Sequence, residues 1–317
     1  MTHRARDVSL HLCTGSSYVR VSEALRRLWG SAPSAETLRR EVLRTGQELS
    51  GQQRREAERV VTGQVEEPSK APERMYVVLD GGWARGTKKR QWHEGKLGTV
   101  YTDRRARVSK GRYRLTDRVK VGTFGCSEQL GELVYAEAFG KGVERAGQVV
   151  VLGDGAGWIR TIKEHQFPQA ELRLDAFHVL QALERGLRAA YPEDAGKRRQ
   201  KKTQLKDLIW RGKLDEALRR LRLIARYAPQ EASALHETIA YLSRQAPYIP
   251  AYGELQRRGE MISSALAEET VDRALNQRFK HGHRHWTRDG AEALLSLRLL
   301  VDNHRWDQYW SSTQSPA

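Results

Sequence analysis

Three acidic residues, Asp80, Asp154 and Glu268, combine a residue type and a setting that suit metal-assisted chemistry. Asp80 follows the apolar run 75–79, Asp154 follows the run 149–153, and Glu268 lies on a predicted helix far downstream. Phosphodiester transfer uses two divalent cations about 3.5–4 Å apart, one beside the attacking oxygen and one beside the leaving oxygen. Magnesium prefers hard oxygen ligands, so carboxylates are the side chains required. We therefore predict that these acids bind two Mg²⁺ or Mn²⁺ ions and catalyse phosphodiester chemistry.

Small residues surround the first two acids. Glycines at 81–82 follow Asp80, and a Gly-Ala-Gly run at 155–157 follows Asp154, so each predicted strand end leaves room for metal and a bulky polymer. An Asp-Gly pair after a strand is also a common turn signal. The pair of acids, each in its own strand setting, therefore indicates a site more strongly than either acid does alone.

The sequence pattern that indicates the third acid, Glu268, is weaker. Glu268 borders the apolar side of a helix predicted over 262–280, from which it can face the sheet. Glu269 and Asp272 remain alternatives, because the pattern does not separate them from Glu268. Surface acids on an amphipathic helix would look the same.

The segment from Arg85 to Lys120 is strongly basic and carries interleaved aromatic residues. It holds thirteen Lys and Arg residues against three acids. Cations that displace counterions from phosphates, beside flat rings that stack on bases, are typical of a nucleic-acid surface. A solvated hairpin edge protected by charge is the alternative. The candidate DNA contacts in this segment are Arg85, Lys88, Lys89, Arg90, Arg104, Arg105 and Arg107.

The overall composition points to the same kind of partner. The chain has 317 residues, a formal net charge of +16 and a pI near 10.0, which favours binding to a polyanion. Its two cysteines, Cys13 and Cys126, lie far apart, which excludes a zinc finger and argues against a disulfide framework. The sequence has neither an apolar run of membrane-spanning length nor a signal-peptide core, so we expect an intracellular protein with no membrane partner.

Residues 1–72 are predicted to form a small helical region. Apolar residues recur at helical spacing over 18–29, and Ser34 can cap a second helix over 35–44. Two such helices can form a helix-turn-helix whose second helix reads the major groove, although any small helical hairpin has the same pattern. Residues 50–72 are expected to form a helix tail and a linker. The candidate readers are Arg39, Arg40 and Arg44.

Residues 73–180 change to strand patterns and are predicted to be the first part of an α/β catalytic core. Short connections make the first three strands antiparallel, whereas the last two alternate with helices and should be parallel. This order is that of a ribonuclease-H-like mixed sheet. A helical insertion over 181–258 and a C-terminal part of the core over 259–317, with the Glu268 helix, complete the predicted organisation. The predicted strands are 75–80, 97–103, 118–124, 149–153 and 171–175, with a helix near 128–138.

Several sequence blocks carry a resemblance to a known family. They are Leu79–Gly82, Gly153–Ile159, Leu174–Leu180, Ser264–Glu268, Arg278–Lys280 and Trp286–Ala293. Together they resemble the DDE transposases of bacterial insertion sequences, in particular the ISLre-type and Kra-type group related to Mutator-like elements. The resemblance extends from about residue 76 to residue 300. It implies that Asp80, Asp154 and Glu268 are the metal-binding triad, with a helical insertion before the Glu.

The resemblance also implies that Asp175 and His178 form the Asp-x-x-His signature of this group, close to the second Asp. The residues alone make Asp175 an N-cap for the helix that begins at Ala176, with His178 in its first turn. Positioning of DNA and support of the active site are the alternative roles. Further expected DNA contacts are His178, Arg278, Lys280 and Trp286.

These patterns predict a metal-dependent DNA transposase that hydrolyses a phosphodiester at an element end and joins the freed 3′-OH to target DNA. The expected partners are double-stranded DNA, at element ends and target, and further copies of the chain bound on DNA, in the cytoplasm at the nucleoid. Relatives have a longer N-terminal region and a small-Ser-Gly approach to the Glu, where this chain has Ser-Ser-Ala at 263–265. The alternative is a truncated, non-catalytic relative that only binds element ends.

Overall fold

The computed structural model describes residues 1–103, 105–109, 112–227, 233–263, 272–280 and 284–313. The chain folds into two compact units, which we call the first unit (residues 1–149, 161–169 and 267–317) and the second unit (residues 150–160 and 170–266). Both cysteines are free. None of the helices in the described part of the chain is long and apolar enough to cross a membrane.

The first unit begins with α1 (His3–Gly15), α2 (Tyr18–Trp29) and α3 (Ala35–Val61). Each helix starts at a hydroxyl N-cap: Thr2, Ser17 and Ser34 each accept a backbone N–H from the first turn. The helix at 18–29 and the Ser34 cap are therefore confirmed. The second helix does not end near residue 44 but continues to Val61. Its continuation is rich in Gln, Glu and Arg, which favour helix, and Leu49 and Ala57 are buried.

Five strands form a mixed sheet in the order β5-β2-β1-β6-β7. Strand β2 pairs antiparallel with both β1 and β5, and β6 pairs parallel with β7, so the predicted strand directions are confirmed. The sequence analysis missed a second hairpin, in which β3 (Arg105–Ser109) pairs antiparallel with β4 (Arg112–Leu115). The strands of the sheet are β1 (Arg74–Arg85), β2 (Trp92–Thr102), β5 (Val119–Thr123), β6 (Gln148–Gly153) and β7 (Glu171–Leu174).

The expectation that Asp80 ends the first strand is wrong. β1 continues to Arg85, and Asp80 pairs with Leu97 in the interior of the β1–β2 ladder. Gly81 and Gly82 do not form a turn, because they pair with residues 95–96 of β2. Asp154, in contrast, directly follows β6 as predicted.

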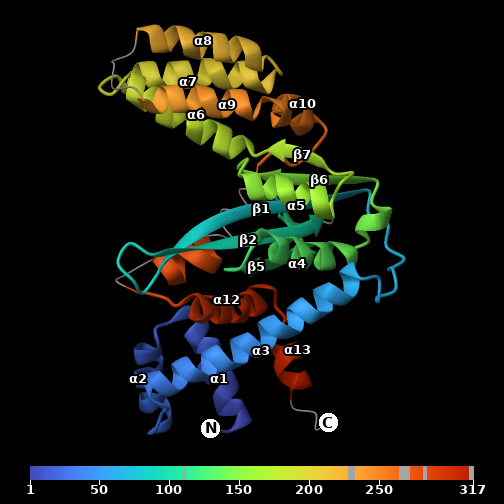
Figure 1. Ribbon diagram of the computed structural model, residues 1–317, viewed down its shortest axis with the longest axis vertical. Helices are drawn as coiled ribbons and strands as arrows, with labels where there is room; N and C mark the ends of the chain where they lie inside the picture. The colour runs from blue at the N-terminus through green and yellow to red at the C-terminus, as the bar shows by residue number, and fades with distance from the viewer. Residues whose placement is uncertain (104, 110–111, 228–232, 264–271, 281–283, 314–317) are drawn as a thin grey trace. The chain divides into compact units, whose positions relative to one another are not determined.

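Helices cover both faces of the antiparallel strands in the first unit (Figure 1). Helix α4 (Ser127–Phe139), predicted near 128–138, lies on one face, where a Cβ on Gly98 would lie 2.4 Å from Val134. The other face packs against α12 (Arg288–Asp302) and a wide π-type helix, η3 (Asp272–Lys280), where a Cβ on Gly122 would lie 3.3 Å from Leu299. The remaining elements are a 3-10 turn, η1 (Val143–Arg145), and the helices α5 (Gly157–Gln166) and α13 (Trp306–Ser312).

The second unit is mainly a helical bundle, as Figure 1 shows for α6 to α9. Buried Leu183, Leu187, Leu221 and Leu235 lie in its core. The run of helices is broken at Pro247 by a 3-10 turn, η2 (Ala246–Tyr248). The helices are α6 (Ala176–Ala190), α7 (Ala195–Trp210), α8 (Leu214–Arg226), α9 (Ser233–Arg244) and α10 (Tyr252–Arg257).

Helix α3 packs against α12 at very short range. A Cβ on Gly46 would lie 2.2 Å from the backbone carbonyl oxygen of Ala293. Gly46→Ala should therefore push the helices apart and lower the free energy of unfolding by about 1–3 kcal/mol, measured by urea denaturation. Gly15→Ala is the control, because nothing lies within 4 Å of its added Cβ, and it should be close to neutral. Equal losses in the two variants would contradict the close contact.

Candidate active site

The acid that follows β6 is held in a fixed turn. Asp154 Oδ1 accepts a hydrogen bond from the Ala156 amide at 2.8 Å. The Tyr241 hydroxyl donates to the Asp154 carbonyl oxygen at 2.7 Å, and the Gln245 side-chain amide donates to the Gly155 carbonyl at 2.9 Å. Gly155 has a φ of 85°, and a Cβ there would lie 2.6 Å from Gln245, so the turn requires glycine. Side chains of α9 and the residue after it therefore set where the Asp154 carboxylate points.

Asp175 caps α6 and contacts His178, which confirms the predicted N-cap. Its side chain is fully buried, and Oδ1 accepts from the Phe177 amide at 2.8 Å. Oδ2 lies 3.3 Å from His178 Nδ1. A proton on Nδ1 satisfies this contact and leaves the Nε2 lone pair available to a ligand. A ring nitrogen of His178 and a carboxylate oxygen of Asp154 lie within 4.8 Å of each other, which places both in reach of one ion.

Two tyrosines of the second unit hold the backbone around this pair. Burial raises the pKa of Tyr241, and the charges of Asp154 and Asp175 raise it further. Burial likewise raises the pKa of Tyr252, whose hydroxyl donates to the Leu174 carbonyl at 2.8 Å. Both hydroxyls therefore stay protonated at neutral pH and act as donors.

Asp80 belongs to the first unit, where Oδ1 of its half-buried side chain accepts from the Gly81 amide at 2.7 Å. Glu268 and its alternative Glu269 lie outside the described residues. The other alternative, Asp272, is the first residue of η3.

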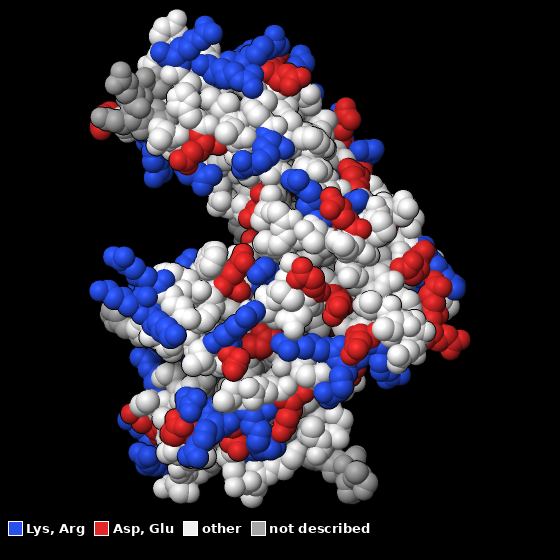
Figure 2. All heavy atoms as spheres, viewed as in Figure 1, with Lys and Arg blue, Asp and Glu red and all other residues white. Residues whose placement is uncertain are grey.

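The turn between β1 and β2 exposes predicted DNA contacts together with aromatic rings. Arg85, Lys88, Lys89 and Arg90 are all exposed. Trp83 and Trp92 are 51% and 48% exposed, and the Arg85 guanidinium lies 5.4 Å from the Trp92 ring. Figure 2 shows Lys and Arg side chains gathered over this end of the hairpin. Of the remaining candidates in this segment, Arg105 and Arg107 lie on β3, and Arg104 is outside the described residues.

The other basic candidates are placed differently. Lys280 is exposed, but Arg278 and Trp286 are buried, at 2% and 8% exposure. The candidate readers of α3 are ion-paired within their own helix. Arg39 binds Glu36 through two hydrogen bonds of 2.8 Å, Arg40 lies 3.6 Å from the same Glu36, and Arg44 pairs with Glu41 at 2.9 Å.

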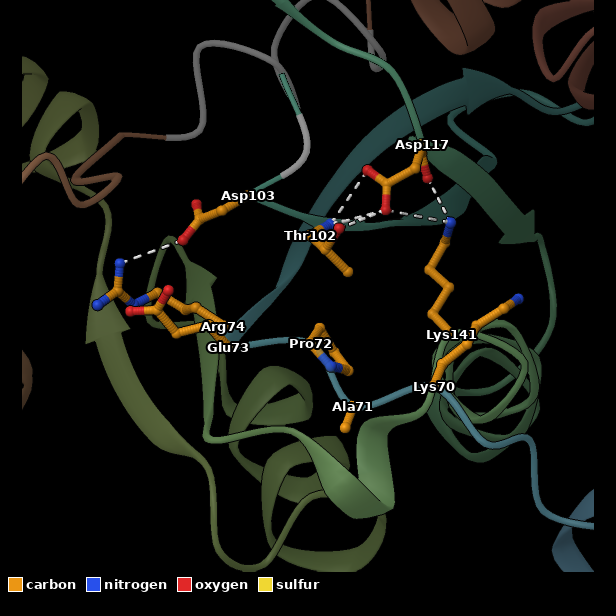
Figure 3. A pocket seen from close by; sticks show the side chains of 9 residues that line it. All are labelled: Lys70, Ala71, Pro72, Glu73, Arg74, Thr102, Asp103, Asp117 and Lys141. Carbon is orange, nitrogen blue, oxygen red and sulfur yellow. Dashed lines mark hydrogen bonds and ion pairs between the residues drawn. The ribbon is translucent and has the colours of Figure 1, made fainter. Parts of the chain in front are cut away.

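A cavity of about 480 Å³ in the first unit is lined by paired charges (Figure 3). Asp117 accepts from the Thr102 hydroxyl at 2.6 Å and lies 3.8 Å from the Lys141 ammonium. Arg74 pairs with Asp103 at 3.2 Å. Burial lowers the pKa of Lys141, which the nearby Asp117 partly offsets. These pairs join the start of β1 to the end of β2, and the segment after β4 to the end of β2 and to the residues after α4, so they stabilise the fold around the cavity.

The protein has an α/β fold with a five-stranded mixed sheet and many helices. The chain belongs to the uncharacterised protein family UPF0236, which it matches over residues 5–308. No curated protein matches the sequence. Among solved structures, the chain is similar to the Drosophila P element transposase strand transfer complex, with 9% identity over 96% of this chain and 93% of that chain, and a TM-score of 0.39. A likeness at this level carries no argument about activity.

Substitution of Asp175 tests its role as the N-cap of α6. Asp175→Asn keeps an oxygen that can accept from the Phe177 amide, whereas Asp175→Ala removes the cap. We expect the alanine variant to unfold with a free energy about 1 kcal/mol lower than the asparagine variant, measured by chemical denaturation. Equal stabilities would show that the cap contributes nothing.

Proposed function

We propose that this protein is a DDE-type DNA transposase in which Asp80, Asp154 and Glu268 hold two Mg²⁺ or Mn²⁺ ions at a ribonuclease-H-like core. The observation that carries the proposal is the Asp154 turn, where a carboxylate in a fixed backbone lies within reach of the His178 ring. Ligating side chains at the end of a strand, in a chain of net charge +16, suit chemistry on a polyanionic substrate.

The side chains fit a divalent ion. Asp154 uses one oxygen for the Ala156 amide, and a carboxylate keeps further lone pairs for a hard cation. His178 offers a nitrogen ligand, which favours a transition-metal ion such as Mn²⁺ over Mg²⁺. When bound, such ions activate the attacking oxygen and stabilise the leaving oxygen of a phosphodiester.

The contribution of the protein itself is position. The Asp175 carboxylate accepts a hydrogen bond from the Nδ1–H group of His178, which fixes the tautomer and orientation of the ring. Tyr241 and Gln245 hold the backbone from which the Asp154 carboxylate projects. This matters because a misplacement of about 1 Å can cost on the order of 100-fold in rate.

The exposed β1–β2 turn supplies the proposed DNA contact. Lys88, Lys89 and Arg90 can neutralise backbone phosphates, and Trp83 and Trp92 offer exposed rings for stacking. In the proposed reaction, water hydrolyses a phosphodiester at the element end. The freed 3′-OH then attacks a target phosphodiester, whose 3′-oxygen leaves. We also propose that copies of the chain pair on double-stranded DNA, at the nucleoid in the cytoplasm.

Substitution of Asp154 tests the proposed chemistry. Asp154→Asn removes the charge but keeps an acceptor for the Ala156 amide. The substrate is a linear duplex carrying the DNA that flanks the coding sequence, with Mn²⁺ present. Cleavage by this variant should fall at least about 100-fold, because loss of a direct ligand should cost at least as much as loss of an outer-shell partner. Asp194→Asn is the matched control, because the Asp194 carboxylate likewise accepts a backbone amide hydrogen bond in the second unit, and it should cleave as well as the wild type.

The outcome separates the two classes of function. Full cleavage by Asp154→Asn would refute the assignment of the metal site. No cleavage by the wild type, together with salt-sensitive binding to the same duplex, would favour the non-catalytic DNA-binding protein.

The basic turn generates a separate prediction. Replacing both Lys88 and Lys89 by Ala should weaken duplex binding and lower the slope of log affinity against log salt by about 2, because each phosphate contact contributes about 0.9. Filter binding at several salt concentrations measures the slope. Arg219 and Arg222, exposed on α8, provide a control pair. A slope lowered by the control pair and not by the lysine pair would place the DNA elsewhere.

A further inference from the structure

A second cavity in the first unit, of about 640 Å³, has more basic than acidic side chains among the described residues that line it. Three arginines line it, Arg39, Arg278 and Arg284, against one acid, Glu36. Glu36 is already bound to Arg39 at 2.8 Å. The Arg284 guanidinium donates to the backbone carbonyl oxygen of Arg278 at 3.3 Å, which holds the Arg284 side chain beside this residue.

Three helices turn their N-terminal ends to this cavity. Residues 17–19 begin α2, residues 35–36 begin α3, and Thr287 and Gly290 belong to the start of α12, and all of them line the cavity. The shortest of the three helices has 12 residues. The N-terminus of a helix carries backbone N–H groups without intrahelical partners and a partial positive charge, so it favours an anion.

Arg278 gives an independent indication of an anionic ligand. The residue is only 2% exposed, and its guanidinium lies 5.5 Å from the Tyr18 ring and 5.0 Å from the Trp286 ring. Its Nε has no hydrogen-bond partner among the described residues. Burial raises the pKa of Cys13 and of Tyr18 to about 12 each, so neither neighbour is an anion at neutral pH. Among the described residues, no acidic group is paired with Arg278. A buried cation without such a partner is unfavourable, and a bound anion would relieve that cost.

We propose that this cavity binds a phosphate group, with Arg278 and Arg284 as the charged donors and the N-termini of α2, α3 and α12 around it. Arginine suits phosphate because its planar guanidinium can donate two parallel hydrogen bonds. The phosphate can come from the backbone of bound DNA, which rests on the proposed function, or from free inorganic phosphate, and the chemistry of recognition is the same.

Inorganic phosphate tests the site without DNA. The melting temperature of the full chain should rise in phosphate relative to chloride of equal ionic strength. Arg278→Met should lose at least about tenfold in phosphate affinity. Its melting temperature in chloride should stay the same or rise, because the substitution removes an unpaired buried charge. Arg59→Met, exposed near the far end of α3, is the control and should keep the wild-type response.

Equal protection by phosphate in the wild type and in Arg278→Met would overturn the proposal. A loss of stability in chloride with unchanged phosphate affinity would also do so, because it would give Arg278 a purely structural role. If Arg278→Met does not fold, Arg284→Gln must show the same loss of phosphate binding.

Measurement of duplex DNA binding identifies the source of the phosphate. If a backbone phosphate enters the cavity, Arg278→Met should lower the salt slope of duplex binding by about 1. An unchanged slope with lost binding of inorganic phosphate assigns the cavity to free phosphate. Phosphate binding by a wild-type protein that binds no duplex would support the cavity and refute the proposed function alone.

Discussion

The hydrogen bonds that Tyr241 and Gln245 donate to the Asp154–Gly155 backbone are the constraint on which the candidate site depends. A turn with a glycine at φ 85° has little conformational preference of its own. Each of these bonds contributes only about 1 kcal/mol to stability, but together they select one direction for the carboxylate. They also give the helical bundle of the second unit a role, because α9 can hold the turn only while its own face stays packed against α6.

Three arginines that are buried or half-buried differ in the groups that accept their hydrogen bonds. Arg173 is buried, and hydrogen bonds to Glu171 and Glu260 outweigh the effect of burial and raise its pKa. Arg298 is half-buried, and it donates to backbone carbonyls, among them that of Ala274 at 3.0 Å. Arg278 lies between aromatic rings with no acidic group bound to it among the described residues. Carboxylates satisfy Arg173 and backbone carbonyls satisfy Arg298, so among these three arginines Arg278 is the one that fits a ligand.

The sequence predicted those features whose signal is local. Helix 18–29, helix 128–138 and the strand before Asp154 show clear periodicity or an apolar run, and their caps and bounds follow from neighbouring residues. The end of the first strand was mispredicted because Gly81 and Gly82 look like a turn, whereas cross-strand pairing with β2 keeps them extended. The strands of the β3–β4 hairpin were not predicted, although a charged hairpin edge was the alternative interpretation of this basic segment.

The parts of the site that escaped prediction are long-range. Tyr241 and Gln245 lie 87 and 90 residues from their acceptors, and nothing in a helical pattern marks them as partners of a distant turn. The Asp175 cap was predictable because both of its contacts lie within three residues. The burial of Arg278 was not, because its aromatic neighbours come from α2 and from the segment before α12.

Binding of Mn²⁺ is the most direct test of the central proposal that Asp80 and Asp154 are metal ligands. Electron paramagnetic resonance of free Mn²⁺, during titration of the full chain, gives the Kd without requiring any DNA substrate. The account predicts that Asp80→Asn and Asp154→Asn each raise this Kd at least about tenfold, whereas Asp194→Asn leaves it unchanged. Equal Mn²⁺ affinity in the wild type and in all three variants would contradict the account.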